Sequence, residues 1–470
     1  MKISSNSIRI ILFVQLIHFL PSCKKVVEIN QPNNSITTVA AFSSDETALS
    51  AVLGIYSRML TASENVTFAT SGITILPGLA SDELTDFAIT APFLRQFKQN
   101  EILSDNAFVL LIWRQAYSYL YQVNECLAAL ESAKSIVSPA LKNQLKGECL
   151  FLRAFIHFYL TNLFGDVPLT TTADWRITSK LSRSNVNLVY EQIIQDLNDA
   201  KSLLNSEYPT SNRVRPNKWA ATTLLARAYL YIGNWTGAES EANEVISSGL
   251  YTPLPALSSV FLQGSHEAIW QLMPIYDQYP AYDATYEGAL FIPYASDAMP
   301  NYIIDDHLYN SFEIGDNRKI NWLTAHVYNG QTYYYPSKYK IRGSGSSSVV
   351  EATMMLRCGE LYLIRAEARA NLNKLNDAID DLNVIRTRAG LINLMNSLTQ
   401  SQTLVAVNAE RRSELFIEWG HRWFDLKRTN KADSVLSPIK GSGWQSTDKL
   451  FPIPLQELQN APNLTQNTGY

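Results

Sequence analysis

Two segments of this chain share a pattern of small and large apolar residues that strongly limits its possible folds. The first runs from Leu225 to Ala238, and the second runs from Ala366 to Leu382. Each contains two alanines twelve residues apart, with large apolar residues at steps of three or four. Such steps are those of an amphipathic α-helix, and alanine allows two helices to cross closely. The pattern therefore predicts two tightly packed helix pairs.

The alternation is similar to that of tetratricopeptide repeats, which stack helix pairs into a solenoid. Gly233 lies at the turn of the first pair and Asn373 at the turn of the second. Both residue types tolerate a left-handed backbone better than most. Isolated repeats cannot bury their apolar faces, so the rest of the chain must pack against them. We expect a mainly α-helical protein built on a tetratricopeptide-like helical-repeat scaffold.

Other segments differ in periodicity. Further helices are predicted at about 45–60, 106–133, 139–164, 185–204, 351–388 and 404–428. Residues 67–105 read as a loop, and the end of the chain reads as an extended, Pro-rich tail. Between residues 251 and 350 the helical period disappears while Tyr, Pro, Gly and Asp accumulate, which predicts an irregular, loop-rich insertion. The insertion separates an N-terminal helical region, 39–250, from a C-terminal region, 351–470.

The beginning of the chain has the features of an export signal. Lys2 and Arg9 precede an apolar run, residues 10–20, that is too short to cross a bilayer. The following Leu20-Pro21-Ser22-Cys23 is similar to a bacterial lipobox, in which the cysteine becomes the acylated first residue. We therefore predict a signal peptide at 1–22, lipidation of Cys23, and a lipidated tether at 23–38. Several acyl chains on one cysteine would hold the protein at a membrane.

Composition and motifs argue against several functions. The 39 basic and 43 acidic residues give a formal charge of −4 without charged blocks, so no nucleic-acid partner is predicted. The sequence lacks common hydrolase, phosphate-loop and metal-site motifs, so no catalytic residue, metal or cofactor is predicted. The adjacent acids Asp82-Glu83 and Asp305-Asp306 are interpreted as loop residues rather than a hydrolytic pair. The cysteines after Cys23 are expected to be free and buried in helices.

Five ordered motifs resemble the SusD/RagB family of outer-membrane nutrient-binding lipoproteins. After the lipobox they lie at 153–155 with 163–169, at 360–368 with 382–391, at 410–415 with 420–428, and at 451–454 with 466–470, where Thr468 replaces a commoner proline. The resemblance implies a non-catalytic, SusD-like protein anchored by lipid in the outer membrane and facing the cell exterior. It also implies delivery of an oligomeric nutrient to a SusC-like, TonB-dependent transporter.

Aromatic residues of the insertion are the main candidates for binding a glycan, because a tyrosine ring can stack on a sugar and its hydroxyl can bond to it. The candidates are Tyr276, Tyr279, Tyr282, Tyr286, Trp322, Tyr333, Tyr334 and Tyr335. Adjacent residues of an extended segment point in opposite directions, so at least one ring of the Tyr333–Tyr335 run should face solvent. The resemblance adds the loop after the first helices, with Asp82, Phe87, Phe93 and Arg95.

Other motif residues are assigned to the structure itself. We expect Trp419, Trp423 and Leu426 in the core, and Glu410, Arg411, Arg412 and Arg422 in ion pairs that fix helix packing.

Two alternatives to glycan capture remain open. A RagB-like peptide binder would need a cleft for backbone hydrogen bonds and fewer exposed rings. A solenoid adaptor for another envelope protein would keep its concave helical face open. The location of the protein also has an alternative. Cys23 is followed by Lys24 and Lys25 and not by the acidic cluster that often accompanies surface display, so an anchor that faces the periplasm stays possible.

Overall fold

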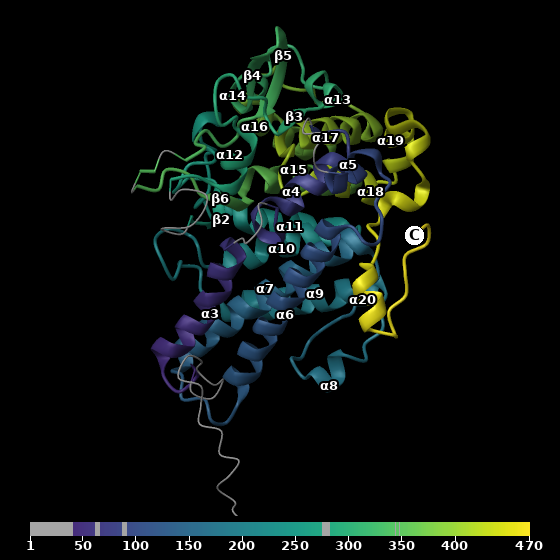
Figure 1. Ribbon diagram of the computed structural model, residues 1–470. Coiled ribbons are helices and arrows are strands. Elements are labelled where there is room, and N and C mark those ends of the chain that lie inside the picture. Colours follow the sequence, from purple (N-terminus) through teal and green to yellow (C-terminus); the bar gives the residue numbers. More distant parts are fainter. Residues whose placement is uncertain (1–40, 62–65, 87–91, 275–282, 344, 347) are drawn as a thin grey trace, which may run out of the picture.

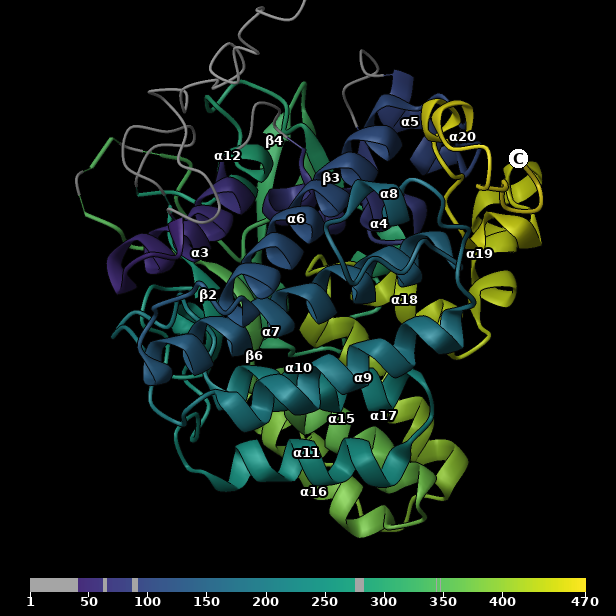
Figure 2. The ribbon, with the colours of Figure 1, turned by 90° about the horizontal axis from the view of Figure 1, so that it is seen from below.

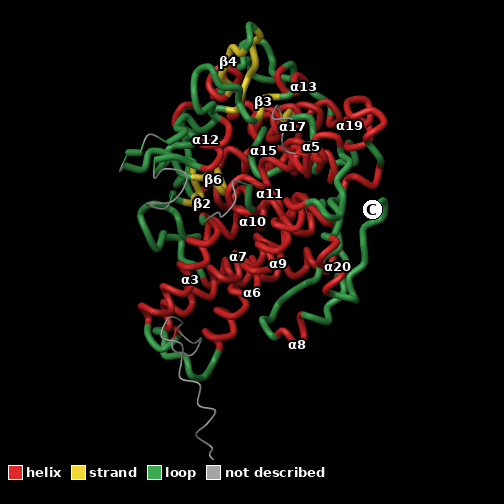
Figure 3. The backbone as a smooth tube through the Cα atoms, viewed as in Figure 1, coloured by secondary structure: helices red, strands yellow, loops and turns green. Residues whose placement is uncertain are grey.

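The computed structural model describes residues 41–61, 66–86, 92–274, 283–343, 345–346 and 348–470 (Figures 1 and 3). The helices of the first half are α3 (Asp45–Leu60), the π-helix η2 (Phe68–Gly72), α4 (Ile73–Ala80), α5 (Pro92–Gln99), α6 (Ala107–Glu131), α7 (Pro139–Phe164), α8 (Trp175–Thr178), α9 (Val186–Leu203), α10 (Lys218–Tyr231) and α11 (Trp235–Ser247). Those of the second half are η3 (Leu257–Ser259), α12 (Tyr286–Phe291), α13 (Asp306–Tyr309), α14 (Asn317–Trp322), α15 (Cys358–Asn371), α16 (Leu375–Arg388), α17 (Gln400–Leu415), α18 (His421–Arg428), α19 (Ala432–Lys440), η4 (Gly441–Gly443), η5 (Ser446–Lys449) and α20 (Leu455–Asn460). The expected mainly α-helical fold is confirmed.

A row of packed helices forms the scaffold. Each of α6, α7, α9, α10, α11, α15 and α16 packs against the next in this order, as the view from below shows (Figure 2). Helices α11 and α15 are neighbours although the whole insertion separates them in sequence. The predicted repeats are the pairs α10–α11 and α15–α16. Their turn residues adopt the expected positive φ, 72° at Gly233 and 61° at Asn373.

Helix ends follow from local chemistry where the sequence carries clear signals. Helix α6 begins after Asn106, whose side chain accepts hydrogen bonds from the N–H groups of Phe108 and Val109. Helix α7 begins at Pro139 and ends before Gly165, which has a φ of 75°. The helices predicted at 45–60, 106–133, 139–164 and 185–204 are confirmed within a few residues.

Four expectations for secondary structure were wrong. Residues 67–105 are not a loop but contain η2, α4, β1 (Leu84–Asp86) and α5. Every residue of α4 is buried, so this helix lacks the polar face that makes a helix visible in sequence. The helix expected from residue 351 is preceded by strand β6 (Thr353–Arg357), and the helix at 404–428 is broken at 416–420. The tail also contains α19 and α20.

Small two-stranded sheets are formed by the strands between α11 and α15, one of which pairs with β1. Strand β1 pairs with β3 (Tyr302–Ile304), β2 (Ala268–Leu272) with β6, and β4 (Leu323–Tyr328) with β5 (Gln331–Pro336), all antiparallel. The β4–β5 hairpin forms one end of the molecule, at the top of Figure 1. Its turn residues, Asn329 and Gly330, both have positive φ, as a two-residue type I′ turn requires.

The expected core and cysteine environments are confirmed. Trp419, Trp423 and Leu426 are buried. Cys126, Cys149 and Cys358 are free and buried. Within the described ranges, no helix combines the length and apolar character needed to span a membrane.

A buried network of charged side chains joins the mid-chain segment to the C-terminal helices. The carboxylate of Glu414, on α17, accepts hydrogen bonds from Arg318, Arg357 and Arg388. Glu267, just before β2, pairs with Arg357 at 3.0 Å and with Arg388 at 2.6 Å. None of these five side chains is more than 6% exposed. Burial alone would raise the pKa of Glu414, but the arginines outweigh it and hold this pKa far below its ordinary value.

Replacing Glu414 by glutamine tests the importance of this network. We expect Glu414→Gln to lower the free energy of unfolding by about 3–5 kcal/mol, because three buried guanidinium groups lose their shared counter-charge. Urea denaturation followed by circular dichroism measures the effect. The matched control is Glu131→Gln, whose ion pair with Lys146 is exposed and should contribute less than about 1 kcal/mol. Equal effects of the two substitutions would contradict the central role of Glu414.

Candidate functional site

The two predicted ligand-binding segments meet at one end of the molecule. Strand β1, which follows α4, pairs with β3 of the insertion in the register Leu84 to Ile304. Strand β3 in turn lies beside β5, and α13 and the β4–β5 hairpin lie at the same end (Figure 1). Tertiary pairing therefore brings the segment around residue 85 close to the rings around residue 334.

Four tyrosines and one lysine of this end form what we call the ring surface: Tyr309, Tyr333, Tyr334, Tyr335 and Lys319. Tyr334 stacks on Tyr309 with ring centroids 4.2 Å apart, and the ammonium of Lys319 lies 3.6 Å from the centroid of Tyr309. All five residues are half-buried, so each exposes part of its side chain. Stacking and the cation–π contact fix two rings before any ligand arrives.

The three consecutive tyrosines divide between the two sides of β5. Tyr334 faces Tyr309, whereas Tyr335 lies near His326, with ring centroids 6.4 Å apart. The hydroxyl of Tyr333 donates to Gln331 at 2.9 Å. The expected alternation along an extended segment is therefore present, and part of each ring reaches solvent.

Two other predicted rings do not reach the surface. Trp322 is fully buried, donates from its indole N–H to the carbonyl of Leu257, and packs against Phe261 and Phe416. Tyr286 is only 4% exposed at the start of α12. The expectation that these rings are open to a ligand was wrong. Both lie at the ends of short helices that turn their large side chains into the core.

Asp82 is also placed differently from the expectation. It is buried, and its carboxylate accepts hydrogen bonds from Arg412 at 2.5 Å and from Arg422 at 2.7 Å. Burial opposes its ionisation, but the two arginines outweigh burial and lower the pKa of Asp82. An acid already paired in this way holds α17 and α18 to the β1 segment and is not free to bind a ligand. The expected ion pairs of Arg412 and Arg422 are thereby confirmed.

The remaining predicted residues fall into two groups. Phe93 and Arg95 are exposed on α5, which packs against β1. Phe87, Tyr276, Tyr279 and Tyr282, together with the lipidation site Cys23, lie outside the described residues.

The acid Asp305 belongs to the polar edge of the same end. Its carboxylate accepts hydrogen bonds from Lys98 at 2.6 Å, from Thr85 at 3.1 Å, and from the backbone N–H of His307 at 2.9 Å. Although burial raises its pKa, the charge of Lys98 dominates and lowers the pKa of Asp305 to about 2. A permanently ionised, paired carboxylate cannot act as a general acid at neutral pH.

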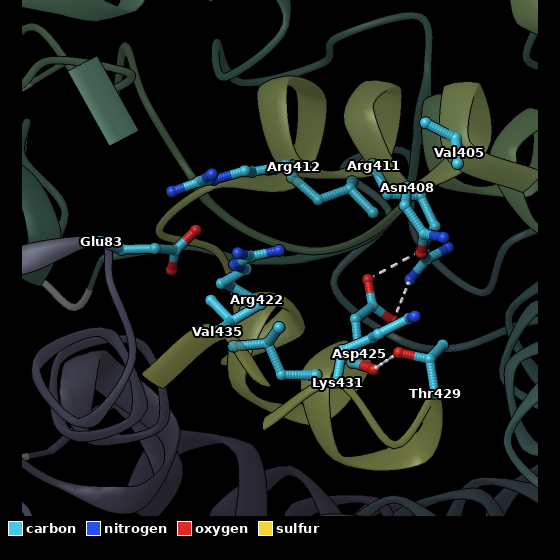
Figure 4. Close-up of a pocket in the computed structure, with 12 residues that line it drawn as sticks. Glu83, Val405, Asn408, Arg411, Arg412, Arg422, Asp425, Thr429, Lys431 and Val435 are labelled. Atoms are coloured by element: carbon cyan, nitrogen blue, oxygen red, sulfur yellow. Dashed lines mark hydrogen bonds and ion pairs between the residues drawn. The ribbon is translucent and has the colours of Figure 1, made fainter. Parts of the chain in front are cut away.

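A narrow pocket of about 220 Å³ lies behind these residues, between α17 and α18 (Figure 4). Figure 4 shows Asp425 paired with Arg411, and Glu83 facing the guanidinium groups of Arg412 and Arg422. Asp425 also accepts from Arg428 at 2.8 Å, so its charge is fully engaged. The pocket is lined by charged side chains where α17 and α18 pack together. Its acids do not face each other across an open space, as the two acids of a hydrolase would.

Glu83 differs from the other acids of this pocket in its hydrogen bonding and in its pKa. Its carboxylate accepts only the backbone N–H of Ile417, at 3.3 Å to each oxygen, among the hydrogen bonds of the described chain. Burial and the charge of Asp82 raise the pKa of Glu83 to about 8.

Two residues of the ring surface were not predicted from the sequence. Tyr309 and Lys319 lie on two short helices whose positions depend on tertiary packing. The hairpin itself had a usable signal, because Asn329-Gly330 between two runs rich in Thr, Val and Tyr is typical of a type I′ turn.

Comparisons with known proteins agree with this architecture. A family model described as "Starch-binding associating with outer membrane" matches residues 62–230, and the model of the SusD family matches residues 309–470. A SusD-like protein, P25, of Formosa agariphila is 23% identical over 98% of this chain and 99% of its own. A SusD superfamily protein of Bacteroides vulgatus has a TM-score of 0.80 at 22% identity, covering 91% of this chain and 99% of its own. A laminarin-binding SusD-like protein has a TM-score of 0.75 at 22% identity, covering 91% and 100%.

The raised pKa of Glu83 predicts a specific pH dependence. A carboxyl whose folded pKa, about 8, exceeds its ordinary value of 4.5 contributes stability that is fully present below pH 4.5. That contribution is lost as the pH rises through 8. We expect Glu83→Gln to remove this loss, so that its stability relative to the unsubstituted protein increases between pH 5 and pH 9. Urea unfolding at several pH values measures the difference, and a constant difference would show that Glu83 is ionised in the fold.

Proposed function

Because this chain belongs to the SusD/RagB family, a family of non-catalytic binding proteins with starch-binding members, we propose that it captures a glycan on the ring surface. The single observation that carries this assignment is the fixed stack of Tyr309 and Tyr334, held by Lys319 at the exposed end of the molecule. Aromatic faces of this kind match the apolar faces of sugar rings, and tyrosine hydroxyls match sugar hydroxyls.

The names of similar proteins support the same ligand class. One matching family model is described as starch-binding, and one solved relative binds laminarin. The exposed Phe93 and Arg95 of α5 extend the proposed contact region beyond the ring surface, and Phe87, Tyr276, Tyr279 and Tyr282 stay in the proposal as candidates from the sequence alone. The paired acids and the absence of hydrolase motifs fit capture without bond cleavage.

We expect the ring surface to be required for glycan binding. Removing the stack by the double substitution Tyr309→Ala and Tyr334→Ala should weaken binding by about five- to 150-fold, since two aromatic contacts of about 0.5–1.5 kcal/mol each contribute about 1–3 kcal/mol. Isothermal titration calorimetry of the full-length protein with starch, laminarin and other soluble polysaccharides measures the loss.

The matched control for this experiment is Ile136→Ala, which removes an exposed apolar side chain between α6 and α7 that does not belong to the ring surface. Unchanged affinity in the double variant would contradict the proposal. Binding of peptides and of no polysaccharide would favour the RagB-like alternative instead.

The proposed role also includes the outer membrane and a SusC-like, TonB-dependent transporter. Family names associate such proteins with the outer membrane. A lipid anchor on Cys23 would tether the folded chain by the polar segment that precedes residue 39. A glycan captured at the cell exterior would then be delivered to the transporter.

Lipidation and surface display can be tested separately. We expect Cys23→Ser to abolish labelling with radioactive palmitate and to release the protein from the membrane fraction. The control Cys126→Ser changes a buried cysteine of α6 and should keep the label. Protease treatment of intact cells should then degrade the unsubstituted protein, and complete protection would place the anchor on the periplasmic side.

A further inference from the structure

A second cavity lies on the flank of α6, remote from the ring surface. It has a volume of about 440 Å³, within the range of roughly 300–1,000 Å³ typical of small-molecule sites. Its walls come from α6, from the segment 168–181 that contains α8, and from α20. Figure 1 shows α8 and α20 beside α6, well below the β4–β5 hairpin.

One wall of the cavity is a stripe of aromatic rings. Trp113, Tyr117 and Tyr121 are four residues apart, so they share one face of α6. The rings of Trp113 and Tyr117 pack with centroids 4.8 Å apart. Exposure increases along the stripe: Trp113 is buried, Tyr117 is half-buried, and Tyr121 is 54% exposed. The outermost ring therefore presents an open face at the mouth of the cavity.

The facing wall of the cavity carries several hydroxyl residues. Thr172 and Thr178 are half-buried and Ser179 is exposed, so their hydroxyl groups can reach a ligand in the cavity. Thr170 lines the same wall but is only 8% exposed, and its Oγ1 is enclosed by protein atoms. The wall can therefore donate to and accept from ligand hydroxyls through three side chains.

Hydrogen bonds hold the walls in place without a ligand. The hydroxyl of Tyr117 donates to the carbonyl of Pro168 at 3.0 Å, and the amide of Asn124 donates to the carbonyl of Thr170 at 3.0 Å. Across the rim, the amide of Asn463 donates to the carbonyl of Lys180 at 2.7 Å. A cavity fixed in this way requires little ordering when a ligand binds.

Charge at the cavity selects against ions. Its two charged residues, Arg114 and Glu457, pair with each other at 2.9 Å across the rim. A ligand with a net charge would gain no unpaired counter-ion there. Aromatic faces, hydroxyl groups and a neutral rim together match a neutral, polyhydroxylated ring.

We propose that this cavity is a second carbohydrate site, which binds one neutral sugar unit independently of the ring surface. The sugar stacks on Tyr121 and exchanges hydrogen bonds with the accessible hydroxyls of Thr172, Thr178 and Ser179. With a second site beside α6, the protein can hold one long glycan, or two separate chains, at two points, which increases the overall avidity.

Hydrogen–deuterium exchange of the full-length protein tests this site. The probes are maltotriose, cellotriose and laminaritriose. At least one of them should slow amide exchange in residues 113–124 and 168–181. Tyr121→Ala should weaken this protection roughly ten-fold in probe concentration, and Thr178→Val should weaken it as well. Tyr121 is exposed, so its substitution leaves the core intact, which a thermal melt verifies.

Ring-surface variants separate this proposal from the previous one. Protection at 113–124 and 168–181 should persist in the Tyr309→Ala and Tyr334→Ala double variant. Slower amide exchange only in the β4–β5 hairpin, or in no segment with any probe, would overturn the second site. Neither result would decide the proposal for the ring surface, which calorimetry tests. Protection of the cavity that Tyr121→Ala does not change would overturn the second site equally.

Discussion

Three arginines from distant parts of the chain share the buried carboxylate of Glu414, and the rest of the molecule is arranged around this contact. Arg318 comes from α14, Arg357 from the end of β6, and Arg388 from the end of α16. Each is a buried cation that would be highly unfavourable alone. Because Glu414 lies on α17, the mid-chain segment can bury these charges only when the C-terminal helices are docked against it. The position of the ring surface relative to the scaffold therefore depends on α17.

The same reasoning explains the charged residues of the C-terminal motifs. Glu410 pairs with Arg318 and Arg386, Arg411 with Asp425, and Arg422 with Asp82. Their partners lie on other elements, so each pair connects two parts of the fold. The pairs hold the elements that carry the binding loops, and the loops are free to present other side chains.

Prediction from sequence succeeded where a helix has one apolar face or a distinct cap. Asn106, Pro139 and Gly165 mark helix ends by local chemistry, and the alanines of α10 and α15 mark close crossings. It failed for α4, which is buried on all sides, and for β6, which becomes a strand only by pairing with β2. Such elements are defined by partners that a single sequence does not place.

In the candidate site, too, local sequence predicts some features and tertiary contacts alone define the others. The alternation of Tyr333, Tyr334 and Tyr335 follows from strand geometry and could be predicted. Which rings are open could not, because Trp322 and Tyr286 become core residues through contacts with distant segments. Tyr309 and Lys319 gain their importance from the hairpin that packs beside them, and no local pattern reveals that neighbour.

The packing of α11 against α15 has a consequence for how the chain acquires its structure. Residues 251–350 lie between these two helices in sequence, so the scaffold row is interrupted until α15 has been synthesised. During N-to-C synthesis, the nascent chain would expose the apolar side of α11 for more than a hundred residues. Contacts of such long sequence separation slow folding. We expect the emerging polypeptide to need a holding chaperone until its last quarter appears.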